Sequence, residues 1–239
     1  MIIENYERIG NFTSSKIFKL TKKDRAGTGF GDPALTYIKN KSREQRAMRS
    51  LENEAWSKEM SWGNFLEPYI HKKLGSDYHL MSDVTDVHPT IKRWVGSKDS
   101  IKFDEGCTVV DIKAPFTLSS YFDFVEADGD IDKFRELHTS GDQYYYQLVS
   151  NAIINNCKYA ELIAYVPQQI ELIDLRLIVG YEEGNEYNWI ARSEDRQLPY
   201  LPAESNVPNM TIIRFEVPQK DIDFLTERVL MANELIKTL

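Results

Sequence analysis

Cysteine, histidine and long apolar runs are scarce in this chain. Its 239 residues include two cysteines, which are too few for a disulfide scaffold, a zinc ribbon or a four-cysteine cluster. The four histidines show no spacing typical of zinc ligands. No segment approaches the roughly 18 to 20 uncharged apolar residues of a membrane span, and the first 25 residues lack the apolar stretch of a signal peptide. We therefore expect a soluble, cytoplasmic protein with reduced cysteines and no membrane partner.

Basic residues are outnumbered by acidic ones. The 29 lysines and arginines face 37 aspartates and glutamates, which gives a net charge of −8. Because phosphate binding favours basic surfaces, this total alone disfavours a nucleic-acid partner. The charge is uneven, since residues 1–50 carry +6 and the remaining 189 residues carry −14. A phosphate-binding surface and a segment that lysines simply keep soluble both fit this asymmetry.

Hydrophobic periodicity predicts an α/β protein that forms one domain over residues 1–239. A glycine-rich loop at 24–33 lacks the Gly-Lys-Ser/Thr of a Walker A motif. Helices are expected at 42–74 (with a break or kink at Gly63 and Pro68), 143–156 and 219–239. Strands are expected at 78–87, 91–103, 107–113, 159–166, 170–179 and 210–217. The polar segments 122–142 and 180–209 are expected to be connections.

The stretch GSKDSIKFDEGCTVVDIKAP, residues 96–115, carries the most informative polar residues. Asp111 and Lys113 are two apart on one predicted strand, so they share a face and interrupt an otherwise apolar run. Asp99 lies twelve residues upstream, and a turn at 104–106 can bring it beside Asp111. Two adjacent carboxylates repel each other unless a cation lies between them, and oxygen ligands favour a hard ion such as Mg²⁺. The stretch therefore predicts a metal site.

This predicted site suits metal-assisted hydrolysis of a phosphodiester. Asp99 and Asp111 would hold Mg²⁺ or Mn²⁺, with the backbone carbonyl of Ile112 as a further ligand, and the metal would activate a water molecule. Lys113 would orient or deprotonate that water, or stabilise the developing charge. An ordinary Asp–Lys structural pair on an edge strand is the alternative, because a D-x-K tripeptide alone is a weak signal.

Two further candidates lie on predicted helices. Glu67 is an acid within the apolar stretch WGNFLEPYI and could reach the same metal or a second one. The helix QYYYQLVSNAIIN has a polar face formed by Gln143, Gln147, Ser150 and Asn151. Gln147 would then look toward the strand that carries the D-x-K element. Each also has a plainer interpretation, as a solvated helix residue for Glu67 and as part of a polar outer face for Gln147.

The order of these elements resembles the PD-(D/E)XK nuclease superfamily, and within it the lambda exonuclease or YqaJ-type viral recombination nucleases. The match covers about 14–166, through the pieces WGNFLEP, GSKDSI, VVDIKAP and YYYQLVSN. The family's site positions fall on Glu67, Asp99, Asp111, Lys113 and Gln147. The sequence departs from the family pattern in having Ser97-Lys98 where Ser-Pro is usual and Asp where Glu is commoner at position 111.

The resemblance implies a restriction-endonuclease-like α/β core, with a central mixed sheet flanked by helices. It implies Mg²⁺- or Mn²⁺-dependent hydrolysis of one DNA strand from a duplex end, with 5′–3′ polarity, in phage recombination beside a single-strand annealing protein. Ring-shaped trimers occur in the family. Residues 167–239 lie outside the match and are expected to extend the core. A restriction- or repair-type endonuclease on the same fold and a non-catalytic DNA-binding module are the alternatives.

A DNA partner gives the net charge of −8 a different interpretation. Some of the acidic residues would hold the metal. Many of the other acidic residues lie in 122–142 and 180–209, which we expect to be away from the DNA. Residues 1–50 would form the phosphate-binding side, with a basic track leading to Lys113.

Overall fold

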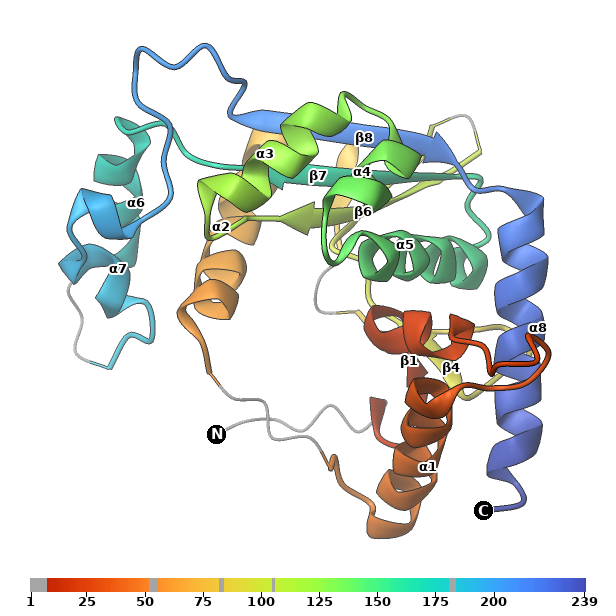
Figure 1. The fold of residues 1–239 in the computed structure, drawn as a ribbon. Coiled ribbons are helices and arrows are strands. Elements are labelled where there is room, and N and C mark those ends of the chain that lie inside the picture. The colour runs from red at the N-terminus through yellow and green to blue at the C-terminus, as the bar shows by residue number, and fades with distance from the viewer. Residues whose placement is uncertain (1–7, 52–55, 82–83, 105, 181–183) are drawn as a thin grey trace.

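The computed structural model describes residues 8–51, 56–81, 84–104, 106–180 and 184–239, which contain both helices and strands (Figure 1). The strands are β1 (Phe12–Thr13), β2 (Tyr78–Leu80), β3 (Asp86–Val87), β4 (Trp94–Gly96), β5 (Ser100–Lys102), β6 (Thr108–Lys113), β7 (Tyr159–Tyr165) and β8 (Met210–Glu216). The α-helices are α1 (Asp32–Ala47), α2 (Lys58–Leu74), α3 (Leu118–Ala127), α4 (Ile131–Leu137), α5 (Gly141–Asn155), α6 (Glu171–Val179), α7 (Asn188–Arg192) and α8 (Gln219–Ile236). Two 3₁₀ helices are η2 (Ser14–Thr21) and η3 (Asp195–Gln197).

The strands form two mixed sheets within the described residues. The larger sheet has the order β2-β5-β6-β7-β8, in which β6 and β7 are parallel and the other neighbours are antiparallel. The smaller sheet has the order β1-β4-β3, in which β1 and β4 are parallel. β5 and β6 pair as the hairpin signal predicts, with Ser100 beside Val110. This register decides where the candidate site residues lie.

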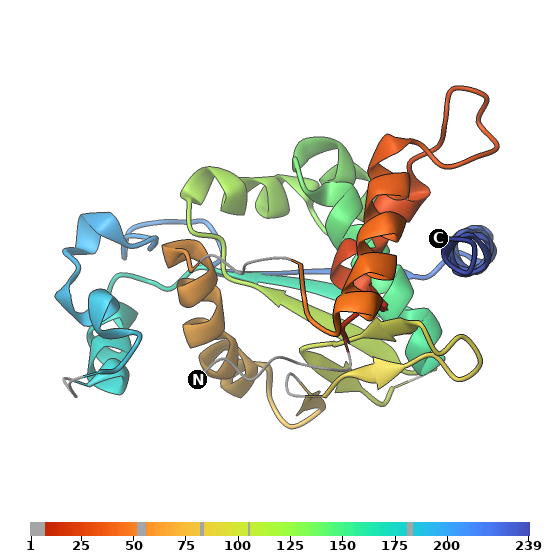
Figure 2. The ribbon, with the colours of Figure 1, turned by 90° about the horizontal axis from the view of Figure 1, so that it is seen from below.

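Helices cover both faces of the larger sheet, with α3 and α5 on one side and α2 on the other (Figure 2). Val109 and Leu162 belong to the core that the sheet shares with α5. Val110 and Ile163, the next residues along the same strands, belong to the core that it shares with α2, α6 and α7. Each such side chain contributes roughly 1.5–3 kcal/mol when it is fully buried. A strand covered on both faces has a nearly continuous apolar sequence, and against this background the charges of Asp111 and Lys113 stand out.

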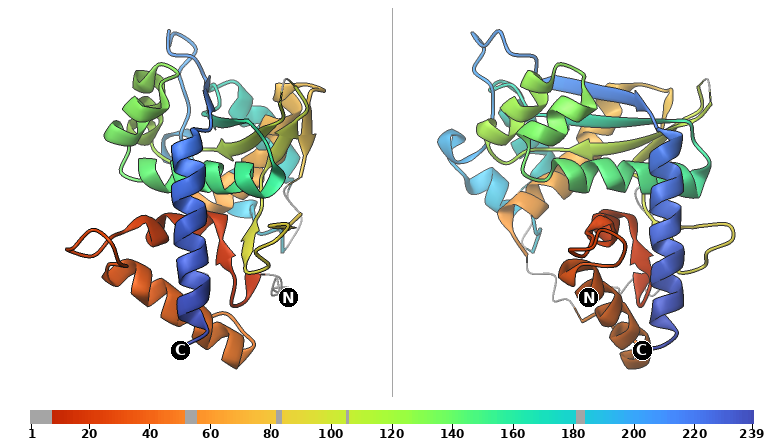
Figure 3. Two further views of the ribbon diagram at one scale, coloured as in Figure 1. Left: turned by 90° about the vertical axis from the view of Figure 1, so that its right-hand side faces the viewer. Right: turned by 45° about the vertical axis from the view of Figure 1, so that its right-hand side comes forward.

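The last helix ties the C-terminal part to the N-terminal part. α8 packs on α5, η2 and α1, and it runs from the sheet down to α1 (Figure 3). Arg228 on α8 is 3% exposed, and its guanidinium donates to the carbonyl oxygens of Leu20, Lys22 and Gly29. The glycine-rich loop is thereby bonded to a helix about 200 residues later in the chain.

The predicted long helix at 42–74 is wrong, because two separate helices occupy this region. α1 begins earlier, at Asp32, and ends at Met48 in the left-handed conformation with a φ of 53°. α2 begins after Ser57, whose side-chain oxygen accepts a hydrogen bond from the first turn. The break expected at Pro68 does not occur, since this proline lies inside the continuous α2. Helix caps, rather than helix breakers, set these boundaries.

The strand predicted at 170–179 is also wrong, because this segment forms α6. Leu172, Leu175 and Val179 recur at helical steps and are the buried residues of that helix. A short apolar run does not distinguish a strand from a buried helix by its periodicity. The connection predicted at 122–142 is likewise corrected, because the second half of α3 and all of α4 lie in it.

Cys107 and Cys157 form a disulfide, with their Cα atoms 4.6 Å apart. The expectation of reduced cysteines is therefore wrong for this structure. The bond joins the start of β6 to the turn between α5 and β7. Of these elements, β6 carries Asp111 and α5 carries Gln147. Within the described residues, no helix has the length and apolar character that crossing a membrane requires.

Candidate active site

Asp99 directly precedes β5, and Asp111 lies on β6, the antiparallel neighbour of β5. The last regular pair of the β5–β6 ladder is Ser100 with Val110, so the next position places Asp99 opposite Asp111. The Asp99 backbone N–H donates to the Val110 carbonyl oxygen at 3.1 Å, and its Oδ2 accepts from the backbone N–H of Ile112 at 2.6 Å. Burial, and after it the charge of Asp111, raise the pKa of Asp99 well above its ordinary value. The structure thus brings together the two carboxylates that the hairpin predicts.

Asp111 is fully buried; its Oδ1 accepts a hydrogen bond, whereas its Oδ2 has an ion-pair contact but accepts no hydrogen bond from the described residues. Gln147 Nε2 donates to Oδ1 at 2.8 Å, and Lys113 Nζ lies 2.7 Å from Oδ2. An isolated buried carboxylate is costly, whereas one that is paired and hydrogen-bonded is tolerated. Gln147 reaches Asp111 from α5, which packs directly on β6. The polar side chain of the helix therefore fixes the orientation of the strand carboxylate.

Lys113 is the cation of the cluster. Its side chain is 22% exposed, and its ammonium lies 4.9 Å from the centre of the Tyr144 ring. Burial lowers the pKa of Lys113, but the charges of Asp111 and Asp99 outweigh this effect and raise it above the ordinary value. Lys113 is therefore a charged ammonium in this arrangement. That state suits the stabilisation of negative charge better than the removal of a proton.

A cleft of about 570 Å³ opens beside this cluster. Its lining includes Glu59 and Glu67 from α2, together with Asp99, Lys113 and Tyr144. Glu67 also raises the pKa of Asp99 through its charge, after the larger effects of burial and Asp111. The predicted site residues thus lie close together. They come from four parts of the chain, namely α2, the residue before β5, β6 and α5.

The donor set of this cluster fits a hard divalent cation. In the part of the chain that the structure describes, no three His, Cys, Asp or Glu side chains are grouped closely enough to hold a metal ion by themselves. Mg²⁺ needs fewer protein ligands, since it usually keeps several waters and binds one or two carboxylates. The raised pKa of Asp99 reflects a repulsion that a cation beside Asp111 would relieve. Asp99 and Asp111 would hold such an ion, with Glu67 and the Ile112 carbonyl as further candidate ligands.

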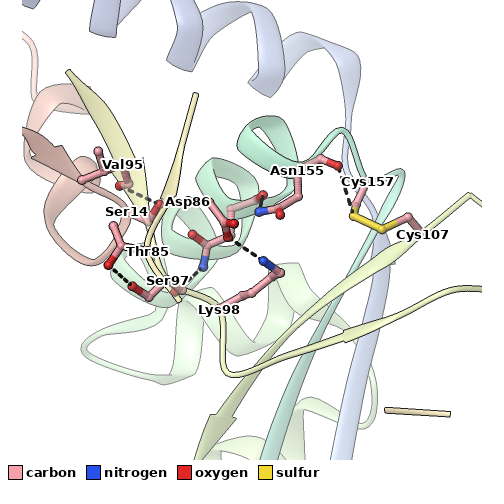
Figure 4. A network of polar contacts seen from close by, with 10 residues as sticks. Ser14, Thr85, Asp86, Val95, Ser97, Lys98, Cys107, Asn155 and Cys157 are labelled. Atoms are coloured by element: carbon pink, nitrogen blue, oxygen red, sulfur yellow. Dashed lines mark hydrogen bonds and ion pairs between the residues drawn. A yellow bond between two sulfur atoms is a disulfide. The ribbon is translucent and has the colours of Figure 1, made fainter. Parts of the chain in front are cut away.

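The C-terminal part of the polar face predicted for α5, Ser150 and Asn151, is buried and contacts the smaller sheet, whereas Gln143 and Gln147 are half-buried. Ser150 Oγ lies 2.7 Å from Ser14 Oγ and accepts from Trp94 Nε1 at 2.7 Å. Asn151 Nδ2 donates to the Ser97 carbonyl oxygen at 3.0 Å, two residues before Asp99 (Figure 4 shows Ser14, Ser97 and their neighbours). The polar face is therefore not an outer surface, because it holds the irregular backbone that leads to Asp99.

The surroundings of Gly96 and Lys98 explain why these two residue types occur in the segment before Asp99. A Cβ on Gly96 would lie 2.3 Å from both Asn151 Oδ1 and Ser14 Oγ, so only glycine fits there. Lys98 is 1% exposed, and its ammonium lies 2.5 Å from Asp86 Oδ2 on β3 (Figure 4). The lysine that replaces the usual proline before Asp99 thus anchors this segment through a buried ion pair.

His138 is a cleft residue that the sequence analysis missed. It is 9% exposed and follows α4, where its Nδ1 accepts from the Ser140 backbone N–H at 3.0 Å. The other ring nitrogen, Nε2, then carries the proton and donates to Ser120 Oγ at 2.9 Å. Burial lowers the pKa of His138 below its ordinary value. No spacing signal in the sequence marks it, because its neighbours in the cleft come from other elements.

Parts of the two acidic segments that we expect to lie away from the DNA border the cleft. Phe124 and His138, from 122–142, line the cleft. From 180–209, Trp189 packs against Phe116, which also lines the cleft, with ring centres 6.0 Å apart. Both segments thus come close to the cleft through aromatic residues and a histidine, and the placement of their acidic residues away from DNA stays a prediction.

Comparison with known proteins supports the fold. No model of a known protein family matches the chain, and no curated protein matches it. Among solved structures, a phage-related exonuclease from Haemophilus somnus 129PT is similar with a TM-score of 0.64 and 14% identity, covering 95% of this chain and 94% of that chain. The alkaline exonuclease LHK-Exo from Laribacter hongkongensis has a TM-score of 0.60 and 14% identity, covering 97% and 90%. LHK-Exo in complex with dAMP has a TM-score of 0.61 and 14% identity, covering 98% and 91%. The chain has the restriction-endonuclease-like fold of these exonucleases, which confirms the fold expected from its resemblance to lambda-exonuclease-like PD-(D/E)XK nucleases.

Proposed function

We propose that the chain is a divalent-metal-dependent DNA exonuclease of the phage-recombination type. The observation that carries this proposal is the pair of opposed carboxylates, Asp99 and Asp111, with Lys113 against Asp111 at one side of an open cleft. The fold shared with solved exonucleases supports it, and one of these, LHK-Exo, is known in complex with dAMP. A nucleotide ligand of a protein with this fold favours DNA as the substrate here.

Each residue of the cluster has a distinct role in this proposal. A bound Mg²⁺ or Mn²⁺ would polarise the scissile phosphate and supply an activated water. Asp99 and Asp111 hold the ion, and Glu67 adds negative charge from the facing helix. Gln147 keeps the Asp111 carboxylate in a fixed orientation through its 2.8 Å hydrogen bond. The Lys113 ammonium stabilises the negative charge that develops on the phosphate.

The finer features of the proposal come from the resemblance noted in the sequence. They are attack from a free duplex end, 5′–3′ polarity, a single-strand annealing protein as partner, and assembly into a ring-shaped trimer. The protein would act in the cytoplasm, where phage and bacterial DNA are found.

The N-terminal basic segment is the proposed phosphate-binding side. η2 and α1 belong to it, and η2 packs on α5, whose Tyr144 lines the cleft. Lys41 is not available for DNA, because it is 6% exposed and its ammonium lies 2.7 Å from Glu44 Oε2. The exposed basic residues of this segment, such as Arg43 and Arg46 on α1, would bind the DNA backbone.

The test compares linear duplex DNA with covalently closed circular duplex DNA in the presence of Mg²⁺ or Mn²⁺. We expect the linear form to be degraded and the circle to survive. Asp111→Asn and Lys113→Ala should each abolish degradation while circular dichroism still shows a folded protein. Equal cutting of the closed circle would indicate an endonuclease. Undiminished activity in either variant would reject the proposed site.

A further inference from the structure

A second hollow lies next to the cleft and shares one wall with it. It measures about 380 Å³, within the range of about 300–1,000 Å³ that is typical of ligand pockets. Phe116 lines both hollows, on the loop that follows β6 and the D-x-K element. The opposite wall comes from the segment around η3 and includes Arg196, Gln197 and Tyr200. Phe116 therefore lies between the cleft and this second hollow.

The two hollows have opposite charge. The cleft is lined by three carboxylates, Glu59, Glu67 and Asp99, and by one lysine, Lys113, so acidic groups predominate there. Among the described residues that line the second hollow, Arg196 is the one charged residue, and the aromatic rings of Phe116 and Tyr200 lie with it. A cation beside aromatic rings favours an anionic ligand with a planar group, which is the chemistry of a nucleotide.

Arg196 is available to such a ligand. Its side chain is 81% exposed, and its present partner is Glu194, which is 66% exposed and lies 2.7 Å away. An exposed ion pair of this kind contributes little stability, so a phosphate can replace Glu194. The guanidinium matches phosphate with two parallel hydrogen bonds.

Contacts with neighbouring side chains hold both walls of the hollow in place. The Phe116 ring packs edge-on against Trp62 and Trp189, with ring centres 6.3 and 6.0 Å apart. On the other wall, Asp195 lies 2.7 Å from the guanidinium of Arg176 on α6. The hollow is therefore a formed feature of the fold, which lowers the ordering cost of binding.

We propose that the second hollow holds one unstacked nucleotide of the DNA strand that passes through the cleft, with its base against Phe116 and Tyr200 and its phosphate on Arg196. This inference rests on the proposed nuclease function. It makes residues 196–202 part of the substrate path and a determinant of substrate affinity.

The test measures the steady-state KM and kcat of Arg196→Gln and Tyr200→Ala on an end-labelled duplex with Mg²⁺. We expect each variant to raise KM about fivefold or more with kcat within twofold, because the site binds DNA away from the reacting phosphate. Arg192→Gln is the control, since Arg192 is an exposed arginine of α7 outside the hollow. Arg196 is exposed, so its replacement leaves folding intact.

A second measurement places the nucleotide. An abasic residue is moved one position at a time along the labelled strand, and KM is measured for the wild type and for Tyr200→Ala. We expect the wild type to lose affinity at one position and Tyr200→Ala to show no such dependence. If the wild type cleaves DNA and both variants keep its KM and its abasic profile, the second hollow is not a nucleotide site. If the wild type cleaves no DNA, the proposed function itself fails, and the inference fails with it.

Discussion

Asn151 Nδ2 donates to the Ser97 carbonyl oxygen at 3.0 Å, one helical turn beyond the Gln147 side chain that donates to Asp111. Residues four apart on a helix lie on the same face. One face of α5 therefore holds both strands of the site, since Gln147 holds the carboxylate on β6 and Asn151 holds the backbone that leads to Asp99. The distance between the two carboxylates depends on how firmly this helix is seated.

Asn151→Ala removes one of these two contacts. The Ser97 carbonyl would lose its donor, and we expect the free energy of unfolding to fall by about 1–3 kcal/mol. We also expect kcat/KM for DNA degradation to fall about tenfold or more after correction for the folded fraction, because Asp99 would shift. Asn155→Ala is the matched control, since Asn155 Nδ2 donates to the Asn151 carbonyl at the end of the helix and, among the described residues, has no hydrogen bond to either strand of the site. An activity loss that merely follows the folded fraction would contradict the positioning role.

Gln147→Ala removes the other contact. Asp111 Oδ1 would lose its donor at 2.8 Å, and the carboxylate would be held less firmly, through the Lys113 ion pair at Oδ2. Replacing a residue that orients a metal ligand costs about 10–100-fold in activity or metal affinity, and we expect both to fall in that range. Calorimetric titration with Mn²⁺ measures the metal affinity without any DNA cleavage. Gln143→Ala, one turn earlier on the same face, should leave both unchanged.

Asp86→Asn tests the anchor beside Asp99. It leaves the Lys98 ammonium buried without its carboxylate partner, and we expect urea unfolding to show a loss of up to about 3 kcal/mol. The double variant Asp86→Leu with Lys98→Met should lose less than Asp86→Asn, because it leaves no buried charge. A double variant that loses more than Asp86→Asn would contradict the anchoring role of this ion pair.

The site was more predictable than the parts that support it. A carboxylate and an ammonium in an apolar strand are visible in a sequence, and the hairpin register places Asp99 opposite Asp111. The burial of Asn151 was not predictable, because a polar helix face has the same sequence pattern whether it meets water or a buried backbone. α6 was mistaken for a strand because its short apolar run fits either structure. The disulfide joins residues 50 apart, and only the fold shows that they meet.

Replacing Cys107 and Cys157 with serine tests the disulfide. Closing a loop of this length restricts the unfolded chain, and we expect the free energy of unfolding to fall by about 2–4 kcal/mol in the absence of reductant. Reduction by dithiothreitol should remove most of the stabilisation that the disulfide gives the wild type. Thiol titration of the unfolded, unreduced protein should detect no free thiol. Two titratable thiols in that assay would show that the bond is absent in solution.

Mg²⁺ or Mn²⁺ should raise the melting temperature of the wild type, because the ion binds the folded carboxylate pair and not the unfolded chain. At a concentration of 100 times Kd the expected stabilisation is about 2.7 kcal/mol. Asp99→Asn should be at least as stable as the wild type without metal, since it removes a buried charge that Asp111 repels. Its melting temperature should respond less to the ion. Asp128→Asn is the control, because Asp128 is exposed and has a left-handed backbone that asparagine also adopts. If the metal stabilises Asp99→Asn as much as it stabilises the wild type, the ion binds elsewhere.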